Sequence, residues 1–244
     1  MSVAELPSNP KSTLVPLTQN QIRGFWASWG GWALDGMDSF IYALVLLPSL
    51  RELLPRSGIA ATKGNVGFYG GLLFALFLFG WGMAFLWGPI GDKFGRVRTL
   101  MLTVVWYSVF TFLSALVTGV WQLAVLRLLA GIGIGGEWAM GGTFVAEEWP
   151  EQRRLAGAGY MHTGYYVGTF FASLANYIIG SHFGWRMMFA VGGLPALLLA
   201  WVRHGVTEPE RWRQKGGAAR SGKIWRPFSA LFSSPLRRRT ILNS

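Results

Sequence analysis

The sequence predicts an all-α membrane protein that folds as a bundle of six transmembrane helices. Of its 244 residues, 52% are hydrophobic and only 14% are charged, and the mean hydropathy is +0.35. Soluble domains have about a quarter of their residues charged. Hydrophobic stretches recur along the chain, and a stretch of about 20 residues is long enough to cross a hydrocarbon layer about 30 Å thick.

The hydrophobic stretches are separated by short polar connections. They cover residues 26–50, 66–90, 99–118, 121–146, 156–180 and 185–203. We therefore expect an N-terminal cytoplasmic tail over 1–24, the helical bundle over 25–203, and a basic cytoplasmic linker over 204–244 that leads toward a missing seventh helix. The tail contains three prolines and no hydrophobic core of a signal peptide, so an uncleaved first helix is expected to follow it.

The distribution of Lys and Arg predicts the orientation of the helices. With the N-terminus inside, the cytoplasmic segments hold 17 of the 22 basic residues, the outer loops hold 4, and Arg127 lies within a span. Because cytoplasmic loops are enriched in Lys and Arg, both termini are expected on the cytoplasmic side of a bacterial inner membrane. This topology accounts for the net charge of +11, so we expect no nucleic-acid partner.

The chain contains no cysteine, which excludes disulfides, thiol catalysis and cysteine metal sites. Its three histidines, His162, His182 and His204, do not have the spacing of a metal site. We expect no metal and no other cofactor.

Two acidic residues interrupt the first hydrophobic segment, in the stretch LDGMD. Asp35 and Asp38 lie on one face of a helix, because residues three apart are neighbours on its surface. An acidic side chain at the centre of a membrane helix costs on the order of 2.5–3.5 kcal/mol, so the pair should face the bundle interior or a wet cavity. The pair suits a reversible proton carrier. The alternative is a neutralised pair that holds helices together. Gly36 would let another helix or a ligand approach closely.

The fourth segment carries Arg127 and Glu137, which lie about 15 Å apart along a helix and cannot pair within it. Arg127 is expected to hold an anionic substrate or to compensate the acids of the first segment, since the planar guanidinium suits carboxylates. A structural ion pair between the first and fourth segments is the alternative. Functional groups in the first and fourth segments suggest two three-helix repeats, an arrangement found in transporters.

The fourth segment also contains a G-x-G-x-x-G pattern, from Gly131 to Gly136. A dinucleotide site needs this pattern after a strand and at the start of a helix, whereas here it lies within an apolar helix. Small residues that allow close helix packing are the better interpretation. The glycines expected in this role are Gly131, Gly133, Gly135, Gly164 and Gly168.

The connection GPIGDKFGRVR, residues 88–98, is expected to form a short loop between two antiparallel helices. Gly95 would permit a tight turn, and Asp92 could bond an arginine or a helix N-terminus. A second acid–base cluster follows in EEWPEQRR, residues 147–154. Together the two clusters predict an inner gate whose ion pairs form and break, with a static topology anchor as the alternative. The expected gate residues are Gly88, Asp92, Gly95, Arg96, Arg98, Glu147 and Arg154.

These motifs resemble those of the major facilitator superfamily. The loop resembles G-x-x-x-D-x-x-G-R-x-R/K, with Val97 where many members have a second basic residue. The fourth segment resembles R-x-x-x-G-x-G-x-G from Arg127 to Gly135, and E-x-x-P-x-x-x-R follows from Glu147 to Arg154. The stretch TEPERW after the sixth segment is similar to the family's E-S-P-R-W. The resemblance implies one half of a twelve-helix fold, built from two three-helix repeats.

Within this family, LDGMD resembles the aromatic-acid:proton symporters, and GGEW and GYYVG resemble the metabolite and sialate:proton symporters. In those branches the acids of the first helix and the arginine of the fourth are implicated in proton coupling and substrate binding. The candidates for these roles are Asp35, Asp38, Arg127 and Glu137. The proline-containing motif of drug antiporters is missing from the fifth segment, which favours symport.

The resemblance implies proton-coupled symport of an organic acid or related metabolite by alternating access, with the chain as the N-terminal half. The expected partners are membrane lipid, a small solute, protons, and a missing C-terminal half or a second subunit. The alternative is a truncated or partner-dependent six-helix protein with no transport activity of its own. An intramembrane enzyme is not expected, because two-aspartate proteases place their acids on different helices.

Overall fold

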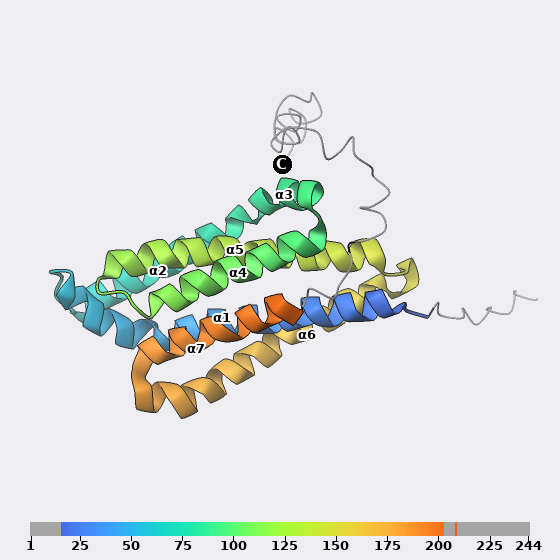
Figure 1. Ribbon diagram of the computed structural model, residues 1–244. Helices are drawn as coiled ribbons and strands as arrows, with labels where there is room; N and C mark the ends of the chain where they lie inside the picture. Colours follow the sequence, from blue (N-terminus) through green and yellow to red (C-terminus); the bar gives the residue numbers. More distant parts are fainter. Residues whose placement is uncertain (1–15, 203–207, 209–244) are drawn as a thin grey trace, which may run out of the picture.

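The computed structural model describes residues 16–202 and residue 208, and the remaining parts of the predicted tail and linker lie outside the described residues. The described part of the chain is helical and contains no strand (Figure 1). In chain order the segments are α1 (Gln19–Arg56), α2 (Lys63–Gly82), the 3-10 helix η1 (Met83–Leu86), α3 (Trp87–Phe94), α4 (Arg96–Ser114), α5 (Val120–Glu148), α6 (Glu151–Ala175), the π-helix η2 (Asn176–Gly180) and α7 (Ser181–Val202). The prediction of an all-α fold is confirmed.

The predicted hydrophobic segments coincide with helical parts of the chain, except that the third, 99–118, extends past the end of α4 at Ser114 and that residue 203 of the sixth lies outside the described residues. Among the described residues, four stretches are long and apolar enough to cross a membrane: Gln19–Arg56, Lys63–Phe94, Arg96–Ser114 and Val120–Glu148. Helix α6 contains 25 residues, and α7 contains 22 with a break at Gly184, so α6 and the part of α7 after the break are also long enough for a membrane span at about 1.5 Å per residue.

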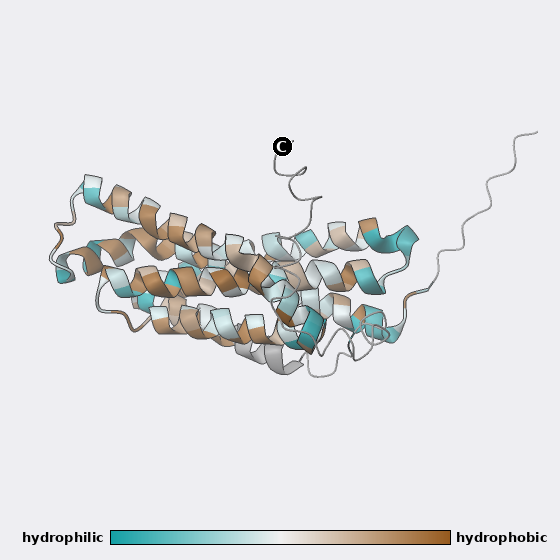
Figure 2. Ribbon diagram, turned by 90° about the horizontal axis from the view of Figure 1, so that it is seen from above, coloured by the Kyte–Doolittle hydropathy of each residue, from teal (hydrophilic) through white to brown (hydrophobic). Residues whose placement is uncertain are grey.

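Helices α1 and α5 are central in the packing of the bundle (Figure 1). Helix α1 packs against α6 and α7, and α5 packs against α2 and α4, while α4 and α7 also pack against each other. Hydrophobic residues extend along most of the helices, and hydrophilic residues gather where α5 turns into α6 (Figure 2). The end of the bundle where α5 turns into α6 is named the α5–α6 end. The opposite end, where α1 turns into α2, is named the α1–α2 end.

The loop expected over residues 88–98 is mostly helical. Helix α3 continues to Phe94 and α4 begins at Arg96, so Gly95 alone separates them. Its φ of 108° is a conformation that glycine adopts without steric cost, and one residue is therefore enough to turn the chain. The tight turn at Gly95 was predicted correctly, whereas the loop over 88–94 was not. Gly91 packs against α5, while Gly88 faces open space.

Glycines let the central helices approach their neighbours closely. A Cβ added at Gly164 or Gly168 of α6 would collide with backbone atoms of α1. At Gly131 or Gly135 of α5 it would collide with the backbone of α2, and at Gly133 it would press against α4. Larger side chains at these positions would force the helices apart, because packed interiors leave no space for an extra methyl group.

Candidate functional site

An ion pair lies buried in the interior of the bundle. Asp38 of α1 and Arg127 of α5 are both fully buried, and Asp38 Oδ2 lies 3.6 Å from Arg127 Nη1. The pair connects the two central helices. At this distance the groups attract each other as charges without forming a short hydrogen bond.

Helices α4 and α7 also contact the Arg127 guanidinium. Its Nη2 donates hydrogen bonds to Thr111 Oγ1 at 3.2 Å and to Ser114 Oγ at 2.9 Å, both on α4. The guanidinium also lies over the rings of Tyr42 and Phe189, 5.6 and 4.8 Å from their centroids. Such cation–π contacts are favourable. Arg127 therefore joins four helices, α1, α4, α5 and α7.

The structure places the other two predicted acids in the interior as well. Asp35 and Glu137 are fully buried, but neither belongs to the ion pair between Asp38 and Arg127. Gly36, between the two aspartates, lies where α1 meets α6, and an added Cβ there would collide with the carbonyl oxygen of Tyr165. The close approach at Gly36 is thus made by a helix.

A second charged group lies at the α5–α6 end. Arg96 Nη2 of α4 lies 2.7 Å from Asp92 Oδ1 of α3 and 3.3 Å from Glu147 Oε1 of α5. Arg96 is 8% exposed, so this arginine is shielded although it lies near a helix end. Arg154 instead donates from Nε to the carbonyl oxygen of Trp149 at 2.9 Å. The structure thus brings three of the predicted gate residues together in ion pairs and places Arg154 on the backbone.

Glu208 is a contact residue that the sequence analysis missed. Its Oε2 accepts a hydrogen bond from the backbone N–H of Val97, and its Oε1 accepts one from Arg98, both at 3.1 Å. Gly95 offers α4 no side-chain cap, so the carboxylate satisfies two otherwise free N–H groups at a positive helix end. The sequence signal was the TEPERW stretch, which contains this glutamate.

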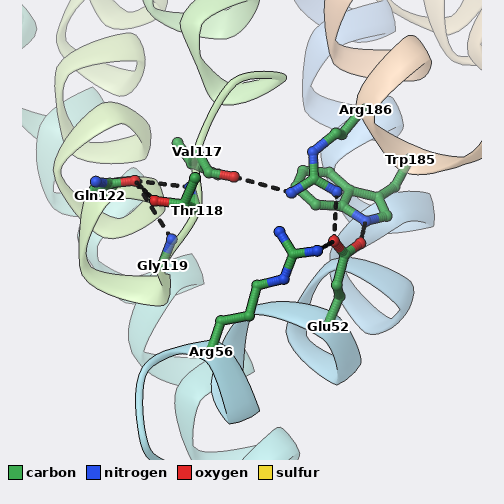
Figure 3. Close-up of polar contacts among 8 residues, drawn as sticks. All are labelled: Glu52, Arg56, Val117, Thr118, Gly119, Gln122, Trp185 and Arg186. Atoms are coloured by element: carbon green, nitrogen blue, oxygen red, sulfur yellow. Dashed lines mark hydrogen bonds and ion pairs between the residues drawn. The ribbon is translucent and has the colours of Figure 1, made fainter.

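A third polar group, at the α1–α2 end, was also missed (Figure 3). Glu52 Oε1 lies 2.7 Å from Arg186 Nη1 and 2.9 Å from Arg56 Nη2, and Glu52 Oε2 accepts from Trp185 Nε1 at 2.8 Å. Arg186 Nη2 also donates to the carbonyl oxygen of Val117 at 3.0 Å. Glu52, Arg56, Trp185 and Arg186 are named the end cluster. It connects α1 and α7 to the chain between α4 and α5.

Five rings from α1, α2, α5 and α6 form a further group, named the ring cluster. Trp32 of α1 stacks on Trp138 of α5, with centroids 4.2 Å apart and planes 14° from parallel. His162 of α6 meets these two indoles edge-on, at centroid distances of 4.7 and 5.8 Å. Trp81 of α2 and Tyr165 of α6 lie 5.3 and 5.9 Å from Trp138. The sequence analysis missed this group, because its members share no local motif.

Comparison with known proteins agrees with the motifs. The family described as Major Facilitator Superfamily matches residues 29–243. The chain is 37% identical over 189 residues to a protein of Haemophilus influenzae that is named for metabolite transport, covering 76% of this chain and 43% of that protein. It is 31% identical over 193 residues to the sialic acid transporter NanX of Escherichia coli, covering 79% and 45%. The chain thus spans less than half the length of these relatives.

Solved structures show the same fold. The bundle superposes on the proton:xylose symporter XylE bound to 6-bromo-6-deoxy-D-glucose with a TM-score of 0.73 at 19% identity. The match covers 91% of this chain and 52% of XylE. At this identity the similarity concerns the fold alone. The six-helix bundle is therefore one half of the twelve-helix fold, and the matched family consists of transporters rather than enzymes.

Proposed function

Because the chain belongs to the major facilitator superfamily, we propose that it forms the N-terminal half of a transporter that carries a small organic acid together with protons. Relatives are named for the transport of sialic acid, niacin, cis,cis-muconate and gentisate, and all four solutes are carboxylic acids. A second six-helix half would complete the solute path, and the two halves would rock against each other in alternating access.

The observation that carries this proposal is the fully buried pair of Asp38 and Arg127. A buried carboxylate needs a compensating charge, because the interior solvates ions poorly. Protonation of Asp38 would neutralise it and remove its attraction for the guanidinium. Since Arg127 also holds α4 through Thr111 and Ser114, one proton would alter contacts among several helices. Asp35 and Glu137 are proposed to bind substrate or to balance charge.

The charged group around Arg96 is proposed as the inner gate. The distribution of basic residues favours both termini in the cytoplasm of a bacterium, which would place the α5–α6 end at the inner face of the plasma membrane. The contact of Arg96 with Glu147, at 3.3 Å, is the longer of its two ion pairs and joins α4 to α5. Glu208 would keep the start of the linker attached to α4 while the gate opens.

The experiment is Asp38→Asn in the complete transporter, reconstituted in lipid vesicles. Asn keeps the shape of the side chain but cannot carry the proton. We expect uptake driven by a proton gradient to fall at least about tenfold, while exchange of labelled for unlabelled solute continues. Sialic acid, niacin, cis,cis-muconate and gentisate are the solutes to screen, and Glu151→Gln, at an exposed acid, is the matched control. Unchanged proton-driven uptake would rule out the coupling role of Asp38.

A further inference from the structure

We propose that four basic side chains at the α1–α2 end attract the anionic solute from the water outside the membrane, before it reaches its binding site. They are named the basic patch, and they are Arg51, Arg56, Lys63 and Arg186. This inference rests on the proposed transport of an organic acid. It also rests on the proposed orientation, in which the α1–α2 end faces the outside.

The first observation is the charge balance of this end. The residues where the helices end and begin here are 51–63, 115–120 and 176–186, and the structure describes all of them. They contain the four basic residues of the patch and a single acid, Glu52. With neutral histidine, four positive charges and one negative charge give this end a net charge of +3.

Membrane topology does not account for this positive charge. Lys and Arg are enriched in cytoplasmic segments, which explains the basic residues of the linker and of the α5–α6 end. In the proposed orientation the basic patch lies on the opposite side of the membrane, where the same bias disfavours it. The patch therefore calls for a separate explanation.

The second observation is that most of this charge has no acidic partner. Glu52 faces both Arg186, at 2.7 Å, and Arg56, at 2.9 Å, so one carboxylate stands between two guanidinium groups (Figure 3). These two arginine side chains are 35% and 52% exposed. Arg51 and Lys63 are also exposed, and neither forms an ion pair among the described residues. The excess positive charge thus faces water.

Helix α1 connects the basic patch to the buried ion pair. Arg51 lies 13 residues after Asp38, which is about 20 Å along the helix. This distance exceeds the Debye length of about 8 Å at physiological salt, so the patch acts on a solute in the water and not on one bound beside Asp38. Surface charge of one sign raises the local concentration of small ions of the opposite sign, and salt weakens this effect. The ion that the patch gathers is an anion, such as a carboxylate.

The first test measures the local concentration of anions with a thiol probe. The chain contains no cysteine, so Ala61→Cys, at an exposed residue between α1 and α2, introduces one thiol once any cysteines of the second half are replaced. The complete transporter in phosphatidylcholine nanodiscs reacts with an anionic and with a cationic methanethiosulfonate reagent. The ratio of the two rates is divided by the ratio for free mercaptoethanol, which cancels the intrinsic reactivity of the reagents.

We expect the anionic reagent to be favoured at least about threefold at about 0.01 M salt. The preference should disappear at about 1 M salt, because the Debye length then falls from about 30 Å to about 3 Å. Equal normalised rates at the lower salt concentration would overturn the inference, since they would show that the patch does not attract anions.

Charge variants connect the patch to transport. Arg51→Glu/Lys63→Glu changes the net charge of this end from +3 to −1 and breaks no ion pair among the described residues. It should abolish the preference for the anionic reagent. It should also raise the KM of uptake into right-side-out vesicles at least about threefold at low salt, with kcat unchanged. The solute is whichever of sialic acid, niacin, cis,cis-muconate and gentisate is taken up fastest.

Two further variants control for effects other than charge at this end. Lys63→Glu alone should produce part of the rise in KM, whereas Lys63→Arg keeps the charge and should keep the KM. Arg23→Glu makes the same charge reversal at an exposed residue near the other end of α1, so it should leave both the KM and the thiol preference unchanged.

The outcomes separate this inference from the proposed function. A KM that Arg51→Glu/Lys63→Glu leaves unchanged would overturn the inference. If that variant instead retains less phosphatidylglycerol on extraction, the patch binds lipid headgroups. The transport proposal would survive either result, as long as proton-driven uptake depends on Asp38. Failure of the complete transporter to take up any of the four acids would overturn both.

Discussion

The buried ion pair and the end cluster join helices with the same chemical groups in opposite surroundings. Asp38 and Arg127 are fully buried and 3.6 Å apart. Glu52 and Arg186 are only 2.7 Å apart, but their side chains are 33% and 35% exposed. The shorter ion pair is thus the more exposed one.

The difference indicates that burial, rather than distance, decides in which of these two regions the loss of one charged partner costs more free energy. Near water, charges are screened, and the loss of one partner leaves the other solvated. In the interior, the loss of one partner leaves a charge that nothing else compensates. We therefore expect the end cluster to hold the helix ends together. We expect protonation to change the contacts among helices most at the buried pair.

The largest effect is expected for Arg127→Leu, which breaks the buried pair from one side. It leaves the Asp38 carboxylate buried without its guanidinium, and removal of one partner of a buried pair costs about 3–5 kcal/mol. Denaturant unfolding in detergent micelles measures the loss in the free energy of unfolding. A loss below about 1 kcal/mol would show that Asp38 takes up a proton or is reached by water once its partner is removed.

The double variant Asp38→Leu/Arg127→Leu sharpens this comparison. Replacing both members of a buried pair by apolar side chains is often close to neutral, so most of the lost stability should return, to within about 1–2 kcal/mol of the wild type. Proton-driven uptake should stay absent. If the double variant is as unstable as Arg127→Leu, then the hydrogen bonds of Arg127 to α4, rather than its charge pairing, dominate its contribution.

A smaller effect is expected for Glu52→Gln in the end cluster. The substitution removes the charge that faces Arg56 and Arg186, while Trp185 can still donate to the amide oxygen. Hydrogen bonds to charged groups contribute more than neutral ones, but partial exposure reduces the loss to about 1–2 kcal/mol. The same unfolding experiment measures it. A loss as large as that of Arg127→Leu would contradict the ranking by burial.

The smallest effect is expected for Arg56→Ala, at the outer edge of the end cluster. Arg56 is 52% exposed, and its ion pair with Glu52 joins residues four apart on one helix, so we expect a loss of about 0.5 kcal/mol or less. The control is Arg51→Ala, since Arg51 is also exposed and forms no ion pair within the described residues. If Arg56→Ala lowers the free energy of unfolding by over about 1 kcal/mol more than Arg51→Ala does, then the residues of the end cluster stabilise the protein cooperatively.

The sequence by itself determined the features that depend on neighbouring residues. The length of each hydrophobic stretch predicts where a helix can span, because membrane thickness sets that length. The glycine at position 95 predicts the turn, since a residue without a Cβ adopts a φ of 108° at no steric cost. The loop over 88–94 was mispredicted, because the helix there is supported by distant contacts. Trp87 donates to the carbonyl oxygen of Ile132 at 2.8 Å, and Gly91 packs on Met140.

Only the tertiary structure decided which groups meet. Asp35 and Asp38 share a helix face, and the packing of α1 against α5 makes Asp38 the partner of Arg127. The members of the ring cluster come from four helices, and no local pattern predicts that Trp32 stacks on Trp138. The physical reason is that helix rotation and contact depend on how surfaces fit across the bundle. Those fits are made by residues far apart in the sequence, such as Gly168 of α6 against the backbone of α1.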